Sequence, residues 1–269
     1  MTGKEITEAL RLGGIENYIF EARILCEELC GIYSEEKDYE SSELSRAVEK
    51  RITGYPLQYI LGKWWFWDCE FFVDENCLIP RADTEAIVEK AIKMLPKNAY
   101  FADLCTGSGC IAISILNTLK ESRADAYELY EKTLDIAKKN ATHNNVDTRF
   151  CGICADVLDP ALLDRKKYDA IISNPPYIRS DVVPTLGRDV LCEPPAALDG
   201  GDDGLIFYRA ILDNFQGSLN EGGMFIFEIG YDQGDDIIRL AVERGMTCEV
   251  FSDLGGNTRG AVIYPNKSN

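Results

Sequence analysis

The sequence predicts an α/β fold in which helices surround a doubly wound, seven-stranded, mostly parallel sheet. Three observations lead to this prediction. Apolar runs of strand length alternate with helical segments from residue 100 onward, and several of these runs end in polar residues. The 269 residues, 46% of them hydrophobic, can bury one large core and a second small unit. We therefore expect a helical bundle over residues 1–62, a β-hairpin connector over 63–80 and the sheet domain over 81–269.

The first 60 residues have the periodicity of packed helices. Apolar residues recur at helical spacing, first at Tyr18, Ala22, Leu25 and Leu29 and again at Leu44, Val48 and Ile52. The aromatic-rich run from Trp64 to Val73 then predicts a hairpin. A helix is expected to open near Asp83 or Thr84.

Strands and helices alternate over the rest of the chain. Strands are expected over 100–104, near Ala126, near Phe150, and over 168–173, 224–228, 247–252 and 260–264. Helices are expected from Cys110, from Lys132, over 205–219 and again up to Arg244, with a long polar loop before Gly204. The last two strands are joined by a short loop, so they are expected to pair antiparallel.

Composition narrows the functional classes. The formal net charge is −17, from 28 basic and 45 acidic residues, and this surface repels nucleic acid. Direct nucleic-acid binding is therefore not expected, whereas a basic protein partner is compatible with the charge. No run approaches the ~18 apolar residues of a membrane span, and the amino terminus lacks an apolar signal segment. We expect a cytoplasmic, monomeric protein that does not bind membranes.

The spacing of the cysteines and histidine does not predict a metal site. Ten cysteines in a cytoplasmic protein are read as thiols, and only Cys151 and Cys154 have ligand-like spacing, without the second pair that such sites require. His143 is the only histidine, and its surroundings indicate a helix end. A catalytic relay built on histidine is therefore not expected.

The most informative motif is Asn174-Pro175-Pro176-Tyr177, which follows the apolar run 168–173. Open α/β sheets bind ligands at the carboxyl ends of their strands. The two prolines fix φ and remove two backbone donors, so carbonyl oxygens and the Asn174 amide oxygen remain as acceptors. Residues 174–177, called the cup below, suit a planar NH2 group. Asn174 and the Pro175 carbonyl can each accept one N–H, while the Tyr177 ring covers one face. The alternative is that these residues form a proline-stiffened turn with no role in binding.

A second motif lies at the end of the first sheet strand. Residues 103–110 read Asp-Leu-Cys-Thr-Gly-Ser-Gly-Cys, where the glycines let the backbone approach a ligand at the next helix's amino end. Gly107, Gly109 and Ala112 also satisfy a relaxed dinucleotide fingerprint, which leaves a nicotinamide or flavin cofactor open. Glu128 is placed to accept hydrogen bonds from ribose hydroxyls, and Asp156 to accept an adenine amino hydrogen while Val157 packs on the ring. Alone, each carboxylate is as readily a helix cap or loop residue; together they favour one adenosine ligand.

Together these residues resemble a known family. The runs 103–109 and 174–178 resemble S-adenosylmethionine-dependent methyltransferases of class I, Rossmann-like fold, that modify amino nitrogens. More closely, the chain resembles the protein-(glutamine-N5) methyltransferases of peptide chain release factors, through Leu78-Ile79-Pro80-Arg81-Ala82-Asp83-Thr84-Glu85 and through the run 193–205.

The resemblance implies an activity and a set of site residues. A methyl group would pass from S-adenosylmethionine to the glutamine side-chain nitrogen of a Gly-Gly-Gln loop, leaving S-adenosylhomocysteine. The amino-terminal bundle would help to hold the release factor. The implied cofactor-binding residues are Asp103, Cys105, Thr106, Gly107, Ser108, Gly109, Glu128, Asp156, Val157 and Asn174. Asn174, Pro175 and Tyr177 would be catalytic, and they would bind the glutamine amide together with Pro176.

Three other functions compete with this interpretation. The same cup can hold the exocyclic amine of adenine or cytosine in DNA or RNA, although the acidic composition and the lack of a basic recognition segment disfavour it. A module that binds the adenosyl ligand and a translation protein without methyl transfer is a second alternative. A nicotinamide oxidoreductase is the third, and no residue beside the cup supplies its acid or base.

Overall fold

The computed structural model of the protein describes residues 1–162, 166–253 and 255–266, and within them it has the predicted architecture. Seven strands form one sheet in the order β5-β4-β3-β6-β7-β9-β8. Neighbouring strands from β5 to β7 pair in parallel, and β9 is antiparallel to both β7 and β8. The prediction of a mostly parallel seven-stranded sheet with an antiparallel closing pair is confirmed.

The strands of this sheet span β3 (Tyr100–Leu104), β4 (Arg123–Glu128), β5 (Phe150–Cys154), β6 (Tyr168–Ser173), β7 (Leu219–Glu228), β8 (Met246–Ser252) and β9 (Thr258–Pro265). The strand order reverses between β3 and β6, which lie side by side although β4 and β5 come between them in the chain. In doubly wound sheets the ligand crevice forms at this reversal.

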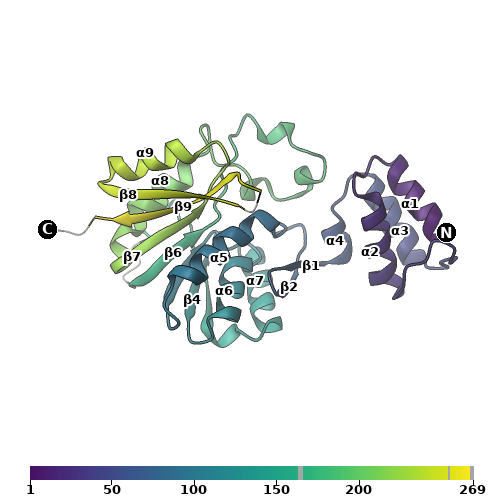
Figure 1. Ribbon diagram of the computed structural model, residues 1–269, viewed down its shortest axis with the longest axis horizontal. Helices are drawn as coiled ribbons and strands as arrows, with labels where there is room; N and C mark the ends of the chain where they lie inside the picture. The colour runs from purple at the N-terminus through teal and green to yellow at the C-terminus, as the bar shows by residue number, and fades with distance from the viewer. Residues whose placement is uncertain (163–165, 254, 267–269) are drawn as a thin grey trace.

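Helices cover both faces of the sheet because consecutive strand residues point to opposite sides. Phe101 of β3 joins the core beneath α5 (Glu85–Met94), α6 (Cys110–Thr118) and α7 (Glu131–His143). Ala102, the next residue, joins the core beneath α8 (Ile206–Phe215) and α9 (Gly234–Glu243). Figure 1 shows these two helical layers on either side of the strands.

The amino-terminal part forms a separate helical unit, at the right of Figure 1. It consists of α1 (Gly3–Leu12), α2 (Tyr18–Cys30), α3 (Ser42–Ile52) and α4 (Leu57–Leu61), which share one core including Leu10, Leu25 and Leu44. A capping box between Thr2 and Glu5 fixes the start of α1. The predicted hairpin follows as β1 (Lys63–Phe66) and β2 (Cys69–Phe72) and connects this unit to the sheet.

The observed boundaries differ from the expected ones mainly in two places. The predicted helix over 205–219 ends at Phe215 and continues as a 3-10 turn over Gln216–Ser218. The predicted strand 224–228 is the last half of β7, which starts at Leu219. Of the loop expected between the last two strands, residue 254 lies outside the described residues. His143 ends α7, as its surroundings predicted.

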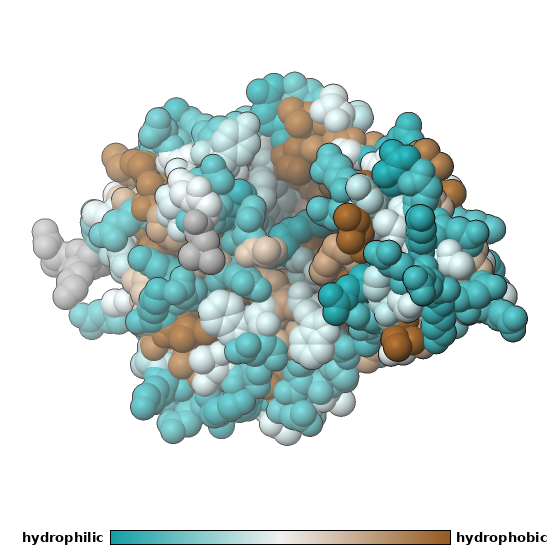
Figure 2. All heavy atoms as spheres, turned by 45° about the vertical axis from the view of Figure 1, so that its right-hand side comes forward, coloured by the Kyte–Doolittle hydropathy of each residue, from teal (hydrophilic) through white to brown (hydrophobic). Residues whose placement is uncertain are grey.

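Polar side chains dominate the surface in Figure 2, and apolar side chains form small separate patches on that face. Within the described ranges, no helix is both long enough and apolar enough to cross a bilayer. All ten cysteines are free thiols, and Cys151 and Cys154 are exposed.

Candidate functional site

The candidate site lies at the carboxyl edge of β3, β4, β5 and β6. A pocket there is lined by residues that follow all four strands, among them Cys105, Glu128, Asp156 and Asn174. The strand-end residues that the sequence analysis assigned to a shared ligand are therefore brought together. Further lining comes from Leu78 before the sheet and from Pro194, Ala196 and Ala197 of the long loop after β6.

The turn between β3 and α6 needs unusual backbone angles. Cys105, Gly107 and Gly109 have positive φ values of 58°, 56° and 83°. Asp103 lies fully buried beneath this turn, where one carboxylate oxygen accepts hydrogen bonds from the Thr106 hydroxyl at 2.6 Å and the Ala112 N–H at 3.2 Å. Burial raises the pKa of Asp103 to about 7. Asp103 therefore fixes the shape of the turn from below.

Glu128 connects this turn to β4. One of its carboxylate oxygens accepts the Gly107 N–H at 3.0 Å, and the other accepts the N–H groups of Leu129 at 3.0 Å and Tyr130 at 3.3 Å. Desolvation raises its pKa, although these three bonds oppose that effect. The carboxylate is half-buried and lines the pocket, so it can also accept hydrogen bonds from a ligand there.

Asp156 and Val157 follow β5 on the same edge. Asp156 is half-buried and accepts the Leu158 N–H at 2.8 Å through one carboxylate oxygen. Val157 is only 4% exposed, and both residues line the pocket beside Tyr127. The arrangement places a carboxylate next to an apolar surface, which suits the amino group and the flat face of an aromatic base.

The Asn-Pro-Pro-Tyr run leaves β6 at the neighbouring position. The Asn174 side-chain nitrogen donates to the Thr84 hydroxyl at 3.2 Å, and that hydroxyl donates to the Glu228 carboxylate at 2.6 Å. The Tyr177 hydroxyl donates to the other Glu228 oxygen at 3.2 Å. Glu228 ends β7 and is 2% exposed; burial raises its pKa to about 7.

The side-chain oxygen of Asn174 is the remaining polar atom of this group. No residue in the described part of the chain donates a hydrogen bond to it, and Asn174 lines the pocket. A ligand N–H can therefore be accepted there.

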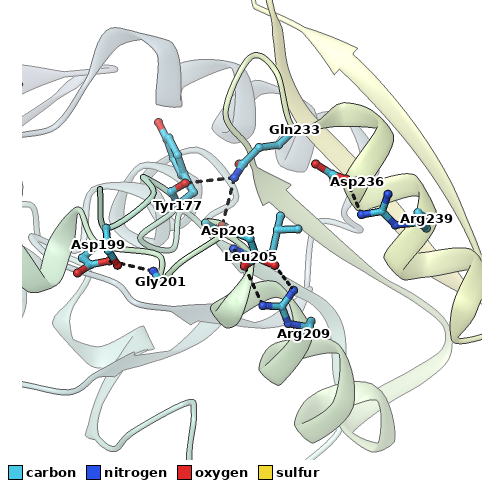
Figure 3. A network of polar contacts seen from close by, with 11 residues as sticks. Tyr177, Asp199, Gly201, Asp203, Leu205, Arg209, Gln233, Asp236 and Arg239 are labelled. Atoms are coloured by element: carbon cyan, nitrogen blue, oxygen red, sulfur yellow. Dashed lines mark hydrogen bonds and ion pairs between the residues drawn. The ribbon is translucent and has the colours of Figure 1, made fainter. Parts of the chain in front are cut away.

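A loop rich in glycine supports Tyr177 from behind. A Cβ on Gly200 would lie 2.7 Å from the Tyr177 Cα, and one on Gly204, whose φ is +72°, would lie 2.4 Å from the Tyr177 carbonyl oxygen. The Gln233 amide nitrogen donates to that carbonyl and to the Gly204 carbonyl, both at 3.1 Å (Figure 3). Asp203 accepts two hydrogen bonds from Arg209 and holds the same loop to α8 (Figure 3).

Glu193 attaches the long loop to the segment before the sheet. It is 2% exposed, accepts the Ile79 N–H at 3.0 Å and forms an ion pair with Arg81. The next residue, Pro194, lines the pocket. The two sequence runs that carried the family resemblance therefore meet at one wall of the site.

The expected site residues fall into two groups. Cys105, Gly107, Glu128, Asp156, Val157, Asn174 and Pro176 line the pocket, whereas Asp103, Thr106, Ser108, Gly109, Pro175 and Tyr177 shape the surrounding backbone without lining it. The sequence analysis missed two partners of the cup, Thr84 and Glu228. From the sequence, Thr84 is a helix start and Glu228 the end of a strand. Glu228 could have been found from the sequence, because it is a carboxylate at the end of an apolar strand, as Glu128 is.

Comparisons with known proteins agree with this geometry. The family model "Methyltransferase small domain" matches residues 84–216. The catalytic domain of hMettl16, solved in complex with the MAT2A 3'UTR hairpin 6, superposes with a TM-score of 0.58 at 16% identity, over 85% of this chain and 84% of that one. A ribosomal protein L11 methylase from Lactobacillus delbrueckii subsp. bulgaricus gives a TM-score of 0.50 at 20% identity, over 69% and 81% of the two chains. These likenesses show that the chain has the fold of class I methyltransferases, a class of enzymes that uses S-adenosylmethionine.

Curated relatives narrow the class. A release factor glutamine methyltransferase from Moorella thermoacetica is 36% identical over 97% of this chain and 96% of its own length. Proteins of the same name from Clostridium botulinum and Caulobacter vibrioides are 36% and 32% identical, over 83% and 94% of this chain and 80% and 91% of their own lengths. The chain belongs to the release factor glutamine methyltransferase family, and the resemblance expected from the sequence is confirmed.

Proposed function

We propose that this protein methylates the side-chain nitrogen of the glutamine in the Gly-Gly-Gln loop of peptide chain release factors. The observation that carries the proposal is the Asn174 amide oxygen, which accepts no hydrogen bond from the described residues and lies in a pocket bordered by the strand-end carboxylates Glu128 and Asp156. Relatives that bear this activity in their names match nearly the whole chain.

The pocket residues fit S-adenosylmethionine. Glu128 would accept the ribose hydroxyls, while Asp156 and Val157 would hold the adenine through its amino group and its face. The backbone of Cys105 and Gly107 would lie along the methionine part. When bound, the cofactor would supply a sulfonium methyl group: a carbon–nitrogen bond forms, the carbon–sulfur bond breaks with its electrons left on sulfur, and the nitrogen then releases one proton to water.

The cup would prepare an otherwise poor nucleophile. An amide nitrogen has a delocalised lone pair, so acceptors on both of its N–H bonds favour the pyramidal geometry that attack requires. Asn174 would accept one N–H and the Pro175 carbonyl the other. The buried Pro176 and the Tyr177 ring would keep the amide from turning away. Positioning, rather than proton removal before attack, is the main catalytic device.

Residues 1–62 would serve as the substrate-recognition domain, joined through the connector 63–80 to the methyltransferase domain 81–269. A groove supports this division. It runs between the helical unit, at Gly14 and Arg51, and the long loop, at Arg188 and Glu193, with Arg81 also lining it. Because Glu193 neighbours the pocket residue Pro194, a release factor lying in this groove would reach the cup. We further propose a cytoplasmic monomer without a nucleic-acid partner, consistent with the charge of −17.

The proposal is tested by incubating the enzyme with methyl-labelled S-adenosylmethionine and either full-length release factor or single-stranded DNA and RNA. Mass spectrometry should locate one methyl group on the glutamine side chain of the release factor. Label on adenine or cytosine instead would support the alternative, a nucleic-acid amino methyltransferase.

Replacing Asn174 with Ala removes one acceptor of the cup. We expect kcat to fall by roughly 10²- to 10³-fold, the range seen when one oriented transition-state partner is lost. The Kd for the cofactor should stay within about twofold, because the strand-end carboxylates remain. Loss of cofactor affinity alone would contradict the assigned role of Asn174.

A further inference from the structure

The orientation of the Asn174 amide depends on two residues outside the cup. Asn174 offers a nitrogen with two donors and an oxygen with two acceptor positions, and either end of the amide can face the pocket. Only the oxygen accepts an N–H of the substrate. A polar group must therefore hold the nitrogen on the other side. Among the residues that the structure describes, only the Thr84 hydroxyl, at 3.2 Å, accepts a hydrogen bond from that nitrogen.

Thr84 has a single hydroxyl hydrogen, which can point to only one neighbour at a time. An ionised Glu228 accepts only, and the 2.6 Å distance between the Thr84 oxygen and the Glu228 carboxylate is that of a charge-assisted hydrogen bond. Thr84 therefore donates to Glu228 and presents only lone pairs to Asn174. Thr84 and Glu228 are 1% and 2% exposed, so solvent does not compete for these bonds.

Tyr177 is tied to the same carboxylate. Its hydroxyl donates to the second Glu228 oxygen at 3.2 Å, and burial together with the Glu228 charge raises the pKa of that phenol, which keeps it protonated as a donor. Glu228 thus holds one hydrogen bond toward the first residue of the cup, through Thr84, and one to the last residue directly.

The electrostatic surroundings of Glu228 come from several elements. Arg259 of β9 lies close enough to favour the charged form, and it also pairs with Asp83 at 2.9 Å and Asp253 at 3.3 Å. Asp83 opposes ionisation. Among the described residues, Tyr177, Tyr208 and Cys110 also interact with Glu228. Burial outweighs the favourable contacts, so the pKa of Glu228 is about 7.

We propose that Thr84 and Glu228 are positioning residues that fix the Asn174 amide with its oxygen toward the substrate, and that this orientation requires Glu228 to be ionised. A protonated Glu228 donates its own hydrogen to Thr84. The Thr84 hydroxyl can then donate its hydrogen to Asn174, which favours the flipped amide with its oxygen toward Thr84. In that orientation the Asn174 NH2 group faces the N–H of the substrate and cannot accept it. This inference rests on the proposed function of the cup.

The sign of the pH effect follows directly. Above the pKa of Glu228 the carboxylate is charged and the amide is correctly held; as the pH falls through about 7, the orientation and the turnover are lost. The expected kcat at saturating cofactor and release factor therefore rises with pH between about 6 and 8. The Glu228→Gln variant has no group that titrates at this place, so the rise should disappear and kcat should be low throughout.

The Thr84→Val variant removes the hydroxyl that connects Asn174 to Glu228 and leaves the charge of the site unchanged. We expect kcat to fall roughly 10- to 100-fold, as for a misplaced reacting group, while the Kd for S-adenosylmethionine stays within about twofold. Thr84→Ser keeps the hydroxyl and should restore most of the turnover. Thr118→Val is the control for the chemical change alone, because it removes an exposed threonine hydroxyl that, within the described residues, donates to the Ser114 carbonyl of α6.

Melting temperatures of all variants, with and without cofactor, separate loss of folding from loss of positioning. Two results would overturn the inference while the wild-type enzyme methylates release factor: a Thr84→Val variant with wild-type kcat, or an unchanged pH profile in Glu228→Gln. If the wild-type enzyme does not methylate release factor at all, the proposed function itself fails. The two failures are therefore distinguishable.

Discussion

At the scale of single residues, the proposed site depends on carboxylates that hold the backbone and are also proposed to bind the ligand. Glu128 accepts three N–H groups from Gly107, Leu129 and Tyr130, and it still lines the pocket. These hydrogen bonds favour the charged form of Glu128 and so oppose the desolvation that raises its pKa. Glu128 thus holds the turn in place, and we propose that it also recognises a ribose.

This double role predicts the effect of replacing Glu128 with Ala. The Kd for S-adenosylmethionine should rise by roughly 10- to 100-fold, because hydrogen bonds to a charged group contribute about 1.5–3 kcal/mol. Isothermal titration calorimetry measures this change. The control is Glu131→Ala, which removes an exposed carboxylate at the start of α7. Equal cofactor affinity in both variants would exclude Glu128 from the cofactor site.

Residues proposed to bind a ligand were easier to predict from the sequence than residues proposed to position them. Asn174, Glu128 and Asp156 follow apolar strands, so their places at one sheet edge follow from topology alone. Thr84 reaches Asn174 across 90 residues of sequence. No periodicity encodes that contact, because it arises only when the start of α5 packs beside the end of β6.

At the scale of elements, the loop from Asp199 to Leu205 fixes the backbone of Tyr177 by close approach. Gly200 and Gly204 both pack against it at distances that exclude a side chain. The sequence predicted a long polar loop here. Its packing on the cup and its bonds to Gln233 could not be predicted, because they depend on where α9 lies.

Gly204→Ala should therefore destabilise the protein and also reduce turnover. The added Cβ meets the Tyr177 carbonyl oxygen at 2.4 Å, and the positive φ adds strain, so we expect a loss of about 2–4 kcal/mol in the free energy of unfolding. Gly245→Ala is the matched control. Its φ is +66°, but nothing lies within 4 Å of the new Cβ, so only the backbone strain of roughly 1 kcal/mol is expected. Urea unfolding of both variants gives the difference; equal losses would show that the contact with Tyr177 is unimportant.

Strand boundaries show a similar limit. The apolar run 224–228 predicted a strand, but β7 begins at Leu219, opposite Tyr168 of β6, and passes through Asn220, Glu221 and two glycines. These residues have no strand pattern of their own. β7 pairs with β6 at Leu219 and again from Met224, with a register shift between Tyr168 and Ala170, so these four residues form an irregular stretch of the strand. Only the pairing on either side of them, which the folded sheet provides, makes them part of β7.

At the scale of the whole molecule, two units are connected by a short hairpin and share a polar groove. In the helical unit, Arg51 of α3 and Glu21 of α2 form an ion pair at 2.5 Å with side chains only 11% exposed. Arg51 also donates to the Tyr55 carbonyl at 3.3 Å and lines the groove. One residue therefore links the core of the helical unit to the surface proposed for the release factor.

Arg51→Ala leaves Glu21 buried without its partner, which costs about 3–5 kcal/mol when a buried pair is broken in this way. We expect the KM for release factor to rise while the Kd for the cofactor is unchanged, because the sheet domain has its own cores. Arg23→Ala breaks an exposed pair with Glu27 and should change neither value. Weakened cofactor binding in Arg51→Ala would contradict the independence of the two units.

The position of β9 has a consequence for how the enzyme is made. This strand, residues 258–265, inserts between β7 and β8 and brings Arg259 to Glu228. During synthesis on the ribosome, β7 can therefore pair on only one side until those residues have emerged, and its terminal carboxylate lacks its nearby cation. An enzyme proposed to act on the machinery that ends translation would thus complete its own site only after residues 258–265 have left the ribosome.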